Sequence, residues 1–375
     1  MSEEPTPATA GAEEPAVDQL GQLRNEIDAV DARIVELVNR RGELAERIGE
    51  VKRRTAPDSP FYRPDREARI LRRVMETNPG PVPAAEVARI VREIMSVCLA
   101  LEQQLTVAFL GPWGTFTQLA VEKQFGGSVQ MTPLESIDAV FREVETGAAD
   151  FGIVPVENST EGVVTHTVDR FAESCLSITG EVEVAIHLCL LVAGYGGQDG
   201  VTEVMGHPQA LAQARGWLDR HLPGVARTEV GSNAIAARRA ADEAGVAAVA
   251  SEAAAHRYGL AIAARNIEDV PGNTTRFLAI GACAPEPTGA DKTSFVFATR
   301  NAPGALYAML KPLADAGISM SRIESRPTRH SKWDYRFFVD VLGHVDDPAL
   351  AAALAEIEAS ASFYKWLGSY PRATG

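Results

Sequence analysis

A run of apolar residues spaced alternately three and four apart, from Leu20 to Val51, most constrains how this 375-residue chain folds. Such spacing places the apolar side chains on one stripe of a continuous helix. At 1.5 Å per residue this helix is roughly 48 Å long, which is longer than a helix needs to be to span one compact domain of this size. We therefore expect it to pack along another long helix, in this chain or in a second subunit. Pro57, Pro60 and Pro64 end it.

One position of the apolar stripe, between Leu37 and Leu44, holds Arg41. At 100° per residue, Lys52 lies about 20° from Arg41 around the helix axis, so two cations share the packing surface. In the ordinary interpretation, Arg41 pairs with a carboxylate of a neighbouring helix or both side chains reach out to water. In the other, the two cations form a pocket for an anion. The helix pattern alone leaves both interpretations open.

The charge balance disfavours polyanions as partners. Lys and Arg number 36 against 50 Asp and Glu, which gives a formal net charge of −14. A chain of this sign is repelled by nucleic acid and by anionic membranes. An anionic small substrate would need cations gathered at one place, which is why Arg41 and Lys52 are informative.

Cysteine and histidine spacing gives no sign of a disulfide scaffold or a metal site. Cys98, Cys175, Cys189 and Cys283 lie far apart with no CxxC pair, and the seven histidines show no ligand spacing. No stretch approaches the roughly eighteen uninterrupted apolar residues of a membrane helix. The acidic N-terminus also lacks the basic region of a secretory signal. We expect a cytoplasmic enzyme or sensor.

Changes of pattern divide the chain into five parts. The first is acidic and poor in large apolar residues, which predicts a disordered tail. Helical periodicity fills the second, and strands alternate with Ala-rich helices in the third. A short Pro- and Gly-containing linker precedes a final βαββαβ unit. The predicted bounds are 1–17, 18–104, 105–283, 284–291 and 292–375.

The helical part resembles the all-helical chorismate mutase family. The residues that carry the resemblance are the run 23–31, Arg41, Lys52 and the triplet Asp65, Arg66 and Glu67. It implies that Arg24, Arg41 and Lys52 hold the carboxylates and ether oxygen of chorismate, with Arg24 reaching into the partner subunit's site. Glu67 would bind the substrate hydroxyl, and Arg66 would support the loop.

Three further positions of the implied chorismate site, Arg63, Cys98 and Glu102, depart from the family pattern. Cys98 and Glu102 are four apart and share a helix face, so Glu102 is expected to point into the site beside Lys52. We take Lys52 and Glu102 as the catalytic pair, because a Claisen rearrangement needs positioning and charge stabilisation but no nucleophile. A carboxylate repels the ether oxygen whereas a protonated carboxyl donates to it. Mutase activity is therefore expected to weaken as the pH rises.

Four short motifs follow in the α/β part. Each alone has an ordinary explanation as a turn, a helix cap or a solvated strand. In this order and spacing they resemble the prephenate dehydratase family, which has two α/β lobes with the site in the cleft between them. The motifs are the runs 111–117, 154–159, 207–209 and 273–277.

The dehydratase resemblance implies a role for each matching residue. Prephenate loses its ring hydroxyl and CO₂ as the ring aromatises, so the reaction needs one proton donor and good positioning. Thr275 would lie nearest the departing hydroxyl and act as a hydrogen-bond donor or relay, and Arg276 would help hold the substrate. The other residues implied to bind prephenate are Thr115, Glu157, Asn158, Ser159, Gln213 and Phe277.

The last part carries two motifs that resemble the regulatory ACT domain. One lies between a strand and a helix, and the other follows the next strand. Amides near Gly304 would take the carboxylate of phenylalanine, and Glu324 would take its ammonium, between the ACT domains of two subunits. An ordinary strand-to-helix turn is the alternative for Gly304. The residues implied to bind phenylalanine are Asn301, Gly304, Ala305, Leu306, Glu324 and Ser325.

Together the three parts resemble the bifunctional chorismate mutase/prephenate dehydratase family. The expected fold is multidomain: an all-α domain, a two-lobed α/β domain and an α+β ACT domain. The implied partners are chorismate, prephenate, the effector phenylalanine and a second copy of the chain, without nucleic acid or membrane. The resemblance implies no metal and no organic cofactor. Two rivals stay open: a dehydratase whose mutase part is impaired by Arg63, Cys98 and Glu102, and an amino-acid sensor without catalysis.

Overall fold

The computed structural model describes residues 14–55, 60–194, 200–300, 302–327 and 335–373. It divides the chain into two compact units, and each is described by itself. The first unit comprises Met1–Phe61 and Val97–Gln103, and the second comprises Tyr62–Ser96 and Gln104–Gly375. Within the described part of the chain, no helix is long and apolar enough to cross a membrane.

The first unit consists of the long helix α1 (Glu14–Thr55) and the end of α3 (Ala84–Glu102). Helix α1 begins at Glu14, so the predicted disordered tail is wrong for residues 14–17, and the rest of that prediction lies outside the described residues. The small residues Gly42, Ala45 and Gly49 are buried. Any side chain at Gly42 or Gly49 would meet the end of α3, since a Cβ there would lie 3.2 Å from Leu101 or 3.3 Å from the backbone of Glu102.

The apolar stripe of α1 lies on a different face from these small residues and is open to solvent. Its members are 41% to 59% exposed, far more than apolar side chains that pack inside a domain. The exposed residues of the stripe are Leu20, Leu23, Ile27, Val30, Ile34, Leu37, Leu44, Ile48 and Val51.

The second unit begins with helix α2 (Pro64–Thr77) and the first part of α3. Pro64 is the first residue of α2. A backbone N–H at this position has no partner inside the helix, so the missing N–H of proline costs nothing. Tyr62 just before the helix packs its ring at 5.3 Å from the rings of both Phe125 and Phe151. This aromatic cluster fixes α2 against the sheet that follows.

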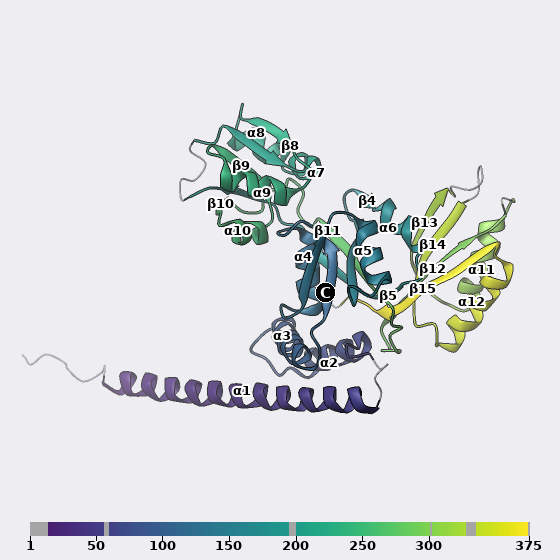
Figure 1. Ribbon diagram of the computed structural model, residues 1–375, viewed down its shortest axis with the longest axis horizontal. Helices are drawn as coiled ribbons and strands as arrows, with labels where there is room; N and C mark the ends of the chain where they lie inside the picture. Colours follow the sequence, from purple (N-terminus) through teal and green to yellow (C-terminus); the bar gives the residue numbers. More distant parts are fainter. Residues whose placement is uncertain (1–13, 56–59, 195–199, 301, 328–334, 374–375) are drawn as a thin grey trace, which may run out of the picture. The chain divides into compact units, whose positions relative to one another are not determined.

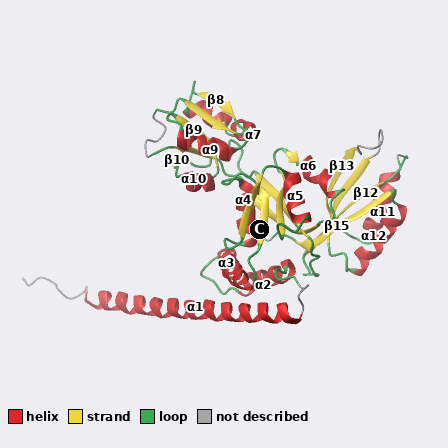
Figure 2. Cartoon of the chain, in the orientation of Figure 1, coloured by secondary structure: helices red, strands yellow, loops and turns green. Residues whose placement is uncertain are grey.

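The predicted α/β part forms two lobes, each built on its own sheet (Figures 1 and 2). The first lobe orders its strands β2-β1-β3-β11-β5, with the short β4 beside β3, and the late strand β11 pairs antiparallel with both β3 and β5. Its strands are β1 (Thr106–Leu110), β2 (Gln130–Leu134), β3 (Phe151–Asn158), β4 (Gly162–Val163), β5 (Ser177–Ala185) and β11 (Thr274–Gly281), and its helices are α4 (Phe116–Phe125), α5 (Ile137–Glu145) and α6 (Thr165–Phe171).

The second lobe lies between β5 and β11 in the chain, so two connecting segments join the lobes. Its five strands are ordered β10-β6-β9-β7-β8 around an Ala-rich core. Its strands are β6 (Cys189–Val192), β7 (Glu203–Gly206), β8 (Ala226–Glu229), β9 (Val246–Ala250) and β10 (Ala261–Ala264), and its helices are α7 (Pro208–Gln213), α8 (Arg215–His221), α9 (Asn233–Asp242) and α10 (Glu252–Tyr258).

The C-terminal part has the predicted βαββαβ order. Its sheet runs β13-β14-β12-β15, and both helices cover one face over an apolar core. Strand β12 begins at Asp291, inside the predicted linker. The elements are β12 (Asp291–Ala298), α11 (Ala305–Asp315), β13 (Met320–Pro327), β14 (Tyr335–Leu342), α12 (Pro348–Ser360) and β15 (Phe363–Pro371).

The face of this sheet that the helices leave free packs on the first lobe. Val296, Phe338 and Leu367 from the C-terminal sheet share one buried cluster with residues of β3, β5 and β11. Gly368 of β15 allows the closest approach, because a Cβ there would collide with the backbone of Ile178 in β5. The C-terminal domain and the strands of the first lobe therefore form one continuous packed body.

Candidate active site

Strands β3 and β11 bring Asn158 and Thr275 together. The two residues are direct cross-strand partners in the antiparallel register. The Asn158 amide nitrogen donates a hydrogen bond of 2.8 Å to the Thr275 hydroxyl oxygen. A hydroxyl that accepts in this way keeps its own hydrogen for another partner. Thr275 is therefore ready to donate.

Asn273, just before β11, connects this pair to the second lobe. Its side-chain oxygen accepts from Asn158 at 2.8 Å and from Ser159 at 3.3 Å. Its amide nitrogen donates to Gln213 of α7 at 3.0 Å. The hydrogen bonds of Asn273 thus bring together three predicted residues from both lobes, Asn158, Ser159 and Gln213, and Asn158 connects them to Thr275.

A pocket of about 690 Å³ lies between the lobes beside Thr115. The first lobe contributes Thr115, which caps α4 by accepting from the Gln118 amide at 3.4 Å. The second lobe contributes His207, Asn233 and Arg238. Burial lowers the pKa of His207, so its imidazole is neutral at pH 7. Arg238 brings a positive charge to the wall of the pocket.

Arg276 does not face this cleft, which corrects the prediction that it holds the substrate. Neighbouring residues of a strand point to opposite faces of the sheet, so Arg276 points away from the side of Thr275. Its guanidinium lies 2.8 Å from Glu181 and 2.7 Å from Asp340 of the C-terminal domain. It also donates to the Tyr370 hydroxyl at 3.0 Å.

Two other predicted prephenate ligands are corrected for related reasons. Glu157 is the cross-strand partner of Arg276 and ion-pairs with Arg322 of β13 at 3.2 Å, on the face opposite to Asn158. Phe277 is 2% exposed, so its ring packs in the core. Neither side chain is presented to the cleft.

The predicted mutase residues fall on both units. In the first unit, Lys52 lies 3.6 Å from a carboxylate oxygen of Glu102, so the expected catalytic pair is adjacent. Cys98, one turn before Glu102, is buried. Arg24 is exposed on α1 and Arg41 is half-buried.

The remaining mutase residues, Arg63, Arg66 and Glu67, lie in the second unit. Arg63 is held by two carboxylates, at 2.8 Å from Asp65 and 2.7 Å from Glu286. These ion pairs already balance its charge, which favours a structural role over chorismate binding. Arg66 is exposed on α2.

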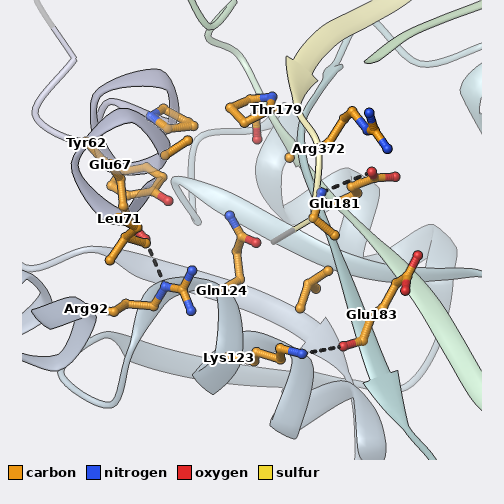
Figure 3. Close-up of a pocket in the computed structure, with 16 residues that line it drawn as sticks. Tyr62, Glu67, Leu71, Arg92, Lys123, Gln124, Thr179, Glu181, Glu183 and Arg372 are labelled. Carbon is orange, nitrogen blue, oxygen red and sulfur yellow. Dashed lines mark hydrogen bonds and ion pairs between the residues drawn. The ribbon is translucent and has the colours of Figure 1, made fainter. Parts of the chain in front are cut away.

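Glu67 lines a small pocket of about 40 Å³ where α2, α3, α4, β5 and the end of β15 meet (Figure 3). Its carboxylate accepts from Arg92 of α3 at 3.2 Å. On the other side of this pocket Glu181 of β5 accepts from the backbone of Ala373 at 3.1 Å. Three predicted domains therefore meet at one junction.

The predicted phenylalanine residues lie on the C-terminal domain, apart from Asn301, which is outside the described residues. Gly304 has a positive φ of 78° and caps the N-terminus of α11, followed by Ala305 and the partly exposed Leu306. On β13, Glu324 and Ser325 alternate, so they face opposite sides of the sheet. Glu324 shares its face with Arg322.

Three family models match the chain in the order of these domains. A chorismate mutase type II model matches residues 23–103, a prephenate dehydratase model matches residues 107–284, and an ACT domain model matches residues 294–359. A bifunctional chorismate mutase/prephenate dehydratase of Stutzerimonas stutzeri is 51% identical over 95% of this chain and 98% of that protein. The chain belongs to this bifunctional family.

Other relatives agree with this membership. A chorismate mutase/prephenate dehydratase of Pseudomonas aeruginosa is 50% identical over 95% of this chain and 98% of its own length. A solved prephenate dehydratase of Arthrobacter aurescens, in complex with L-Phe, is 37% identical with a TM-score of 0.67. It covers 72% of this chain and 90% of its own.

Three residues of these two arrangements were absent from the predicted set. Asn273 belongs to the hydrogen-bond network of Thr275, whereas His207 and Arg238 line the pocket beside Thr115, whose lining does not include Thr275. Asn273 and His207 both belong to motifs that resemble this family. The signals that could have found them were the place of Asn273 two residues before Thr275 and the place of His207 directly before α7. Arg238 gave no sequence signal, because an Arg on an Ala-rich helix is usually solvated. Its place in the pocket wall depends on how the second lobe folds.

Proposed function

We propose that this protein converts chorismate to prephenate and then prephenate to phenylpyruvate, CO₂ and water, and that phenylalanine inhibits it. The observation that carries the proposal is the Asn158–Thr275 hydrogen bond in a chain that matches bifunctional relatives along 95% of its length. The substrates, product and effector are small anions or zwitterions. The compartment we propose is the cytoplasm.

In the dehydratase step the chain's own residues supply a donor and a polar cleft. The bond from the ring carbon to the hydroxyl breaks with its electron pair on oxygen, and a proton converts that oxygen to water. The bond to the ring carboxylate breaks with its electrons entering the ring, which releases CO₂. Thr275 donates toward the departing oxygen, because its hydroxyl oxygen already accepts from Asn158. A Thr hydroxyl is a weak acid, so it acts as donor or relay.

With Arg276 facing the C-terminal domain, the carboxylates of prephenate need other partners. Arg238 and the backbone amides at the start of α9 line the pocket between the lobes. The positive charge of Arg238 and the helix N-terminus both favour an anion there. We assign Arg238 as the cation for one substrate carboxylate.

In the mutase step Lys52 and Glu102 face the breaking carbon–oxygen bond. The Lys52 ammonium stabilises negative charge that develops on the ether oxygen, and Glu102 assists when protonated. Arg24 and Arg41 hold the carboxylates, Glu67 takes the hydroxyl, and Arg66 supports the loop, as the family motif implies. Cys98 lines the site from α3.

A second copy of the chain completes the molecule in this proposal. The apolar stripe of α1 remains 41% to 59% exposed, whereas the small residues Gly42 and Gly49 already pack on α3. Burying a stripe of this length against its equivalent is strongly favourable. Arg24 then reaches the partner's mutase site, and the phenylalanine site proposed below uses the ACT domains of both copies.

Phenylalanine binds between those ACT domains. The amides at Gly304 and Ala305 face its carboxylate, and Leu306 offers apolar contact. Glu324 supplies an acceptor for the ammonium. The Ser325 side chain faces the other side of the sheet, so Ser325 reaches the ligand only through its backbone, and Asn301 precedes the same turn as Gly304. In support, a related dehydratase of Arthrobacter aurescens was solved in complex with L-Phe.

Phenylpyruvate formation by the purified chain tests the whole proposal. With chorismate as the sole substrate, the protein should form phenylpyruvate, and added phenylalanine should reduce the rate. Product from prephenate only would mean that the mutase domain is impaired. No product from either substrate, with phenylalanine still bound, would leave a non-catalytic sensor.

A further inference from the structure

Strands β3 and β11 carry Asn158 and Thr275 on one face of the sheet and a second pair of cross-strand residues on the opposite face. Thr275 is the cross-strand partner of Asn158, and the next pair along the same two strands is Arg276 and Glu157. Because side chains alternate along a strand, this second pair points to the opposite face of the sheet. That face is covered by the ACT domain.

Each member of the reverse pair binds a charged ACT residue. Arg276 is only 11% exposed and lies 2.7 Å from Asp340 of β14. Glu157 lies 3.2 Å from Arg322 of β13. Arg322 and Asp340 are themselves register partners on β13 and β14. Both catalytic strands are thus held from behind by two adjacent ACT strands.

These contacts form one chain of alternating charge. Asp340 also accepts from Ser294 at 2.5 Å, and Lys292 of β12 lies 2.7 Å from Glu181 of the first lobe. Glu181 is the residue seen beside the end of the chain in Figure 3. In spatial order the members are Glu157, Arg322, Asp340, Arg276, Glu181 and Lys292.

Strand β13 contributes both to this chain of charges and to the proposed phenylalanine site. It carries Arg322 and, two and three residues later, Glu324 and Ser325 of the proposed phenylalanine site. A shift of β13 that accommodates phenylalanine would pull Glu157 through its ion pair. Glu157 precedes Asn158 in the same strand, and the 2.8 Å bond from Asn158 to Thr275 is sensitive to small displacements.

We propose that Arg322 is a positioning residue for the dehydratase reaction, which carries the state of the phenylalanine site to Asn158 and Thr275 through Glu157. This inference rests on the proposed function, because it requires a dehydratase that phenylalanine inhibits. It names the residues that couple the phenylalanine site to the dehydratase site in this chain. Coupling between two sites requires an element that both of them bias, and β13 is that element.

The same strand offers a matched control. Arg326 also lies on β13, on the same face as Arg322, and also pairs with a first-lobe carboxylate, at 3.2 Å from Asp169 of α6. Its partner belongs to a helix and not to a catalytic strand. Arg326→Gln therefore removes an interdomain ion pair of the same kind and leaves the contacts of Glu157 and Arg276 unchanged.

The test measures dehydratase rates with prephenate and direct binding of labelled phenylalanine by equilibrium dialysis, using the full chain. Arg322→Gln should bind phenylalanine within about twofold of wild type, yet the ratio of uninhibited to fully inhibited rate should fall about fivefold or more. Its kcat without phenylalanine should fall several-fold with KM unchanged. Arg326→Gln should keep wild-type inhibition.

A second variant protects the test against misfolding of β13. Glu157→Gln removes the other half of the ion pair and leaves the ACT domain intact. It should lose inhibition to the same extent, and the double variant should be no worse than either single variant. Binding of labelled phenylalanine in all variants reports that the ACT domain is folded.

The outcomes separate this inference from the proposed function. Wild-type inhibition retained in Arg322→Gln or Glu157→Gln overturns the inference, and so does equal loss in Arg326→Gln, which would indicate general docking of the domains. A wild-type protein that forms no phenylpyruvate, or that phenylalanine does not inhibit, overturns the proposed function instead.

Discussion

In the dehydratase lobes, Asn158, Asn273 and Thr275 are joined by hydrogen bonds within one unit of the chain. The mutase residues lie on two units, and the long helix that carries Arg24 and Arg41 exposes its apolar stripe. Burial of apolar surface is the main force that holds such a helix. The dehydratase residues are thus brought together within one unit, whereas the mutase residues are divided between two, and we propose that a second copy completes the mutase site.

The largest expected effect comes from removing the Thr275 hydroxyl. Thr275→Val should lower kcat for prephenate by about 10³-fold, because the departing oxygen loses its donor. Chorismate consumption should stay within twofold of wild type, since the mutase residues are elsewhere. Stopped-time assays of phenylpyruvate and of chorismate loss measure both rates.

The neighbouring Thr274 is the control for this substitution. Thr274→Val retains the β-branched shape and leaves the Asn158–Thr275 bond in place. It should change kcat by less than the variant at Thr275. Equal losses in the two variants would contradict the special role of Thr275 and weaken the claim that one chain holds a complete dehydratase site.

The next largest effect is the converse, a variant that should lower mutase activity and spare dehydratase activity. Leu37 is 53% exposed on the stripe of α1, and Leu37→Glu places a charge in the proposed contact between subunits. Mutase activity should fall by about 10²-fold while dehydratase activity stays within about threefold. Sedimentation velocity should show a smaller particle or a weaker self-association.

Glu36→Gln, one residue earlier and outside the stripe, should leave both activities and the sedimentation unchanged. If Leu37→Glu keeps full mutase activity while it associates less, the mutase site is complete in a single chain. That result would remove the contrast between the two regions.

A third effect concerns stability at the ACT interface. Burial raises the pKa of the Asp340 carboxyl, but Arg276, Ser294 and Arg322 lower it more, so its pKa lies below the usual value. Asp340→Asn should reduce the free energy of unfolding by about 2 kcal/mol at pH 7, because Arg276 loses a buried partner. Asp346→Asn, at a residue that is 68% exposed, serves as the control.

The pH dependence of that difference has a definite sign. A carboxyl whose pKa is lowered by folding contributes stability that is present above its unfolded pKa of about 3.9. This contribution is lost as the pH falls through the lower pKa of the folded state. The difference between wild type and Asp340→Asn in urea unfolding should be constant from pH 5 to 7 and shrink below about pH 4. A difference that grows in acid would contradict the assignment.

Sequence patterns predicted the domain order, the long helix, the two lobes and the βαββαβ unit, because periodicity and motif order are local properties of the chain. The family resemblance, and not a local pattern, named Asn158, Ser159, Gln213 and Thr275, which hydrogen bonds through Asn158 and Asn273 bring together. The prediction of Arg276 and Glu157 was wrong because a motif is read as a continuous run, whereas a strand presents alternate residues to opposite faces.

The contacts of Arg322 had no local signal at all. Its partner Glu157 lies 165 positions earlier in the chain, and the pair forms only when the free face of the ACT sheet packs on the first lobe. The apolar residues of such a face, Phe338 among them, are also compatible with any other packing partner. Docking of domains depends on shape over a whole surface, which short patterns do not encode.

The smallest activity effect we expect sharpens the account of the mutase region. Lys52 and Glu102 are 3.6 Å apart, and an ionised Glu102 repels the ether oxygen that Lys52 attracts. Glu102→Gln replaces that carboxylate with an amide that donates at every pH, so mutase kcat/KM at pH 8 should rise about tenfold. Chorismate loss followed by absorbance gives both rates, and a variant no faster than wild type would contradict the role assigned to Glu102.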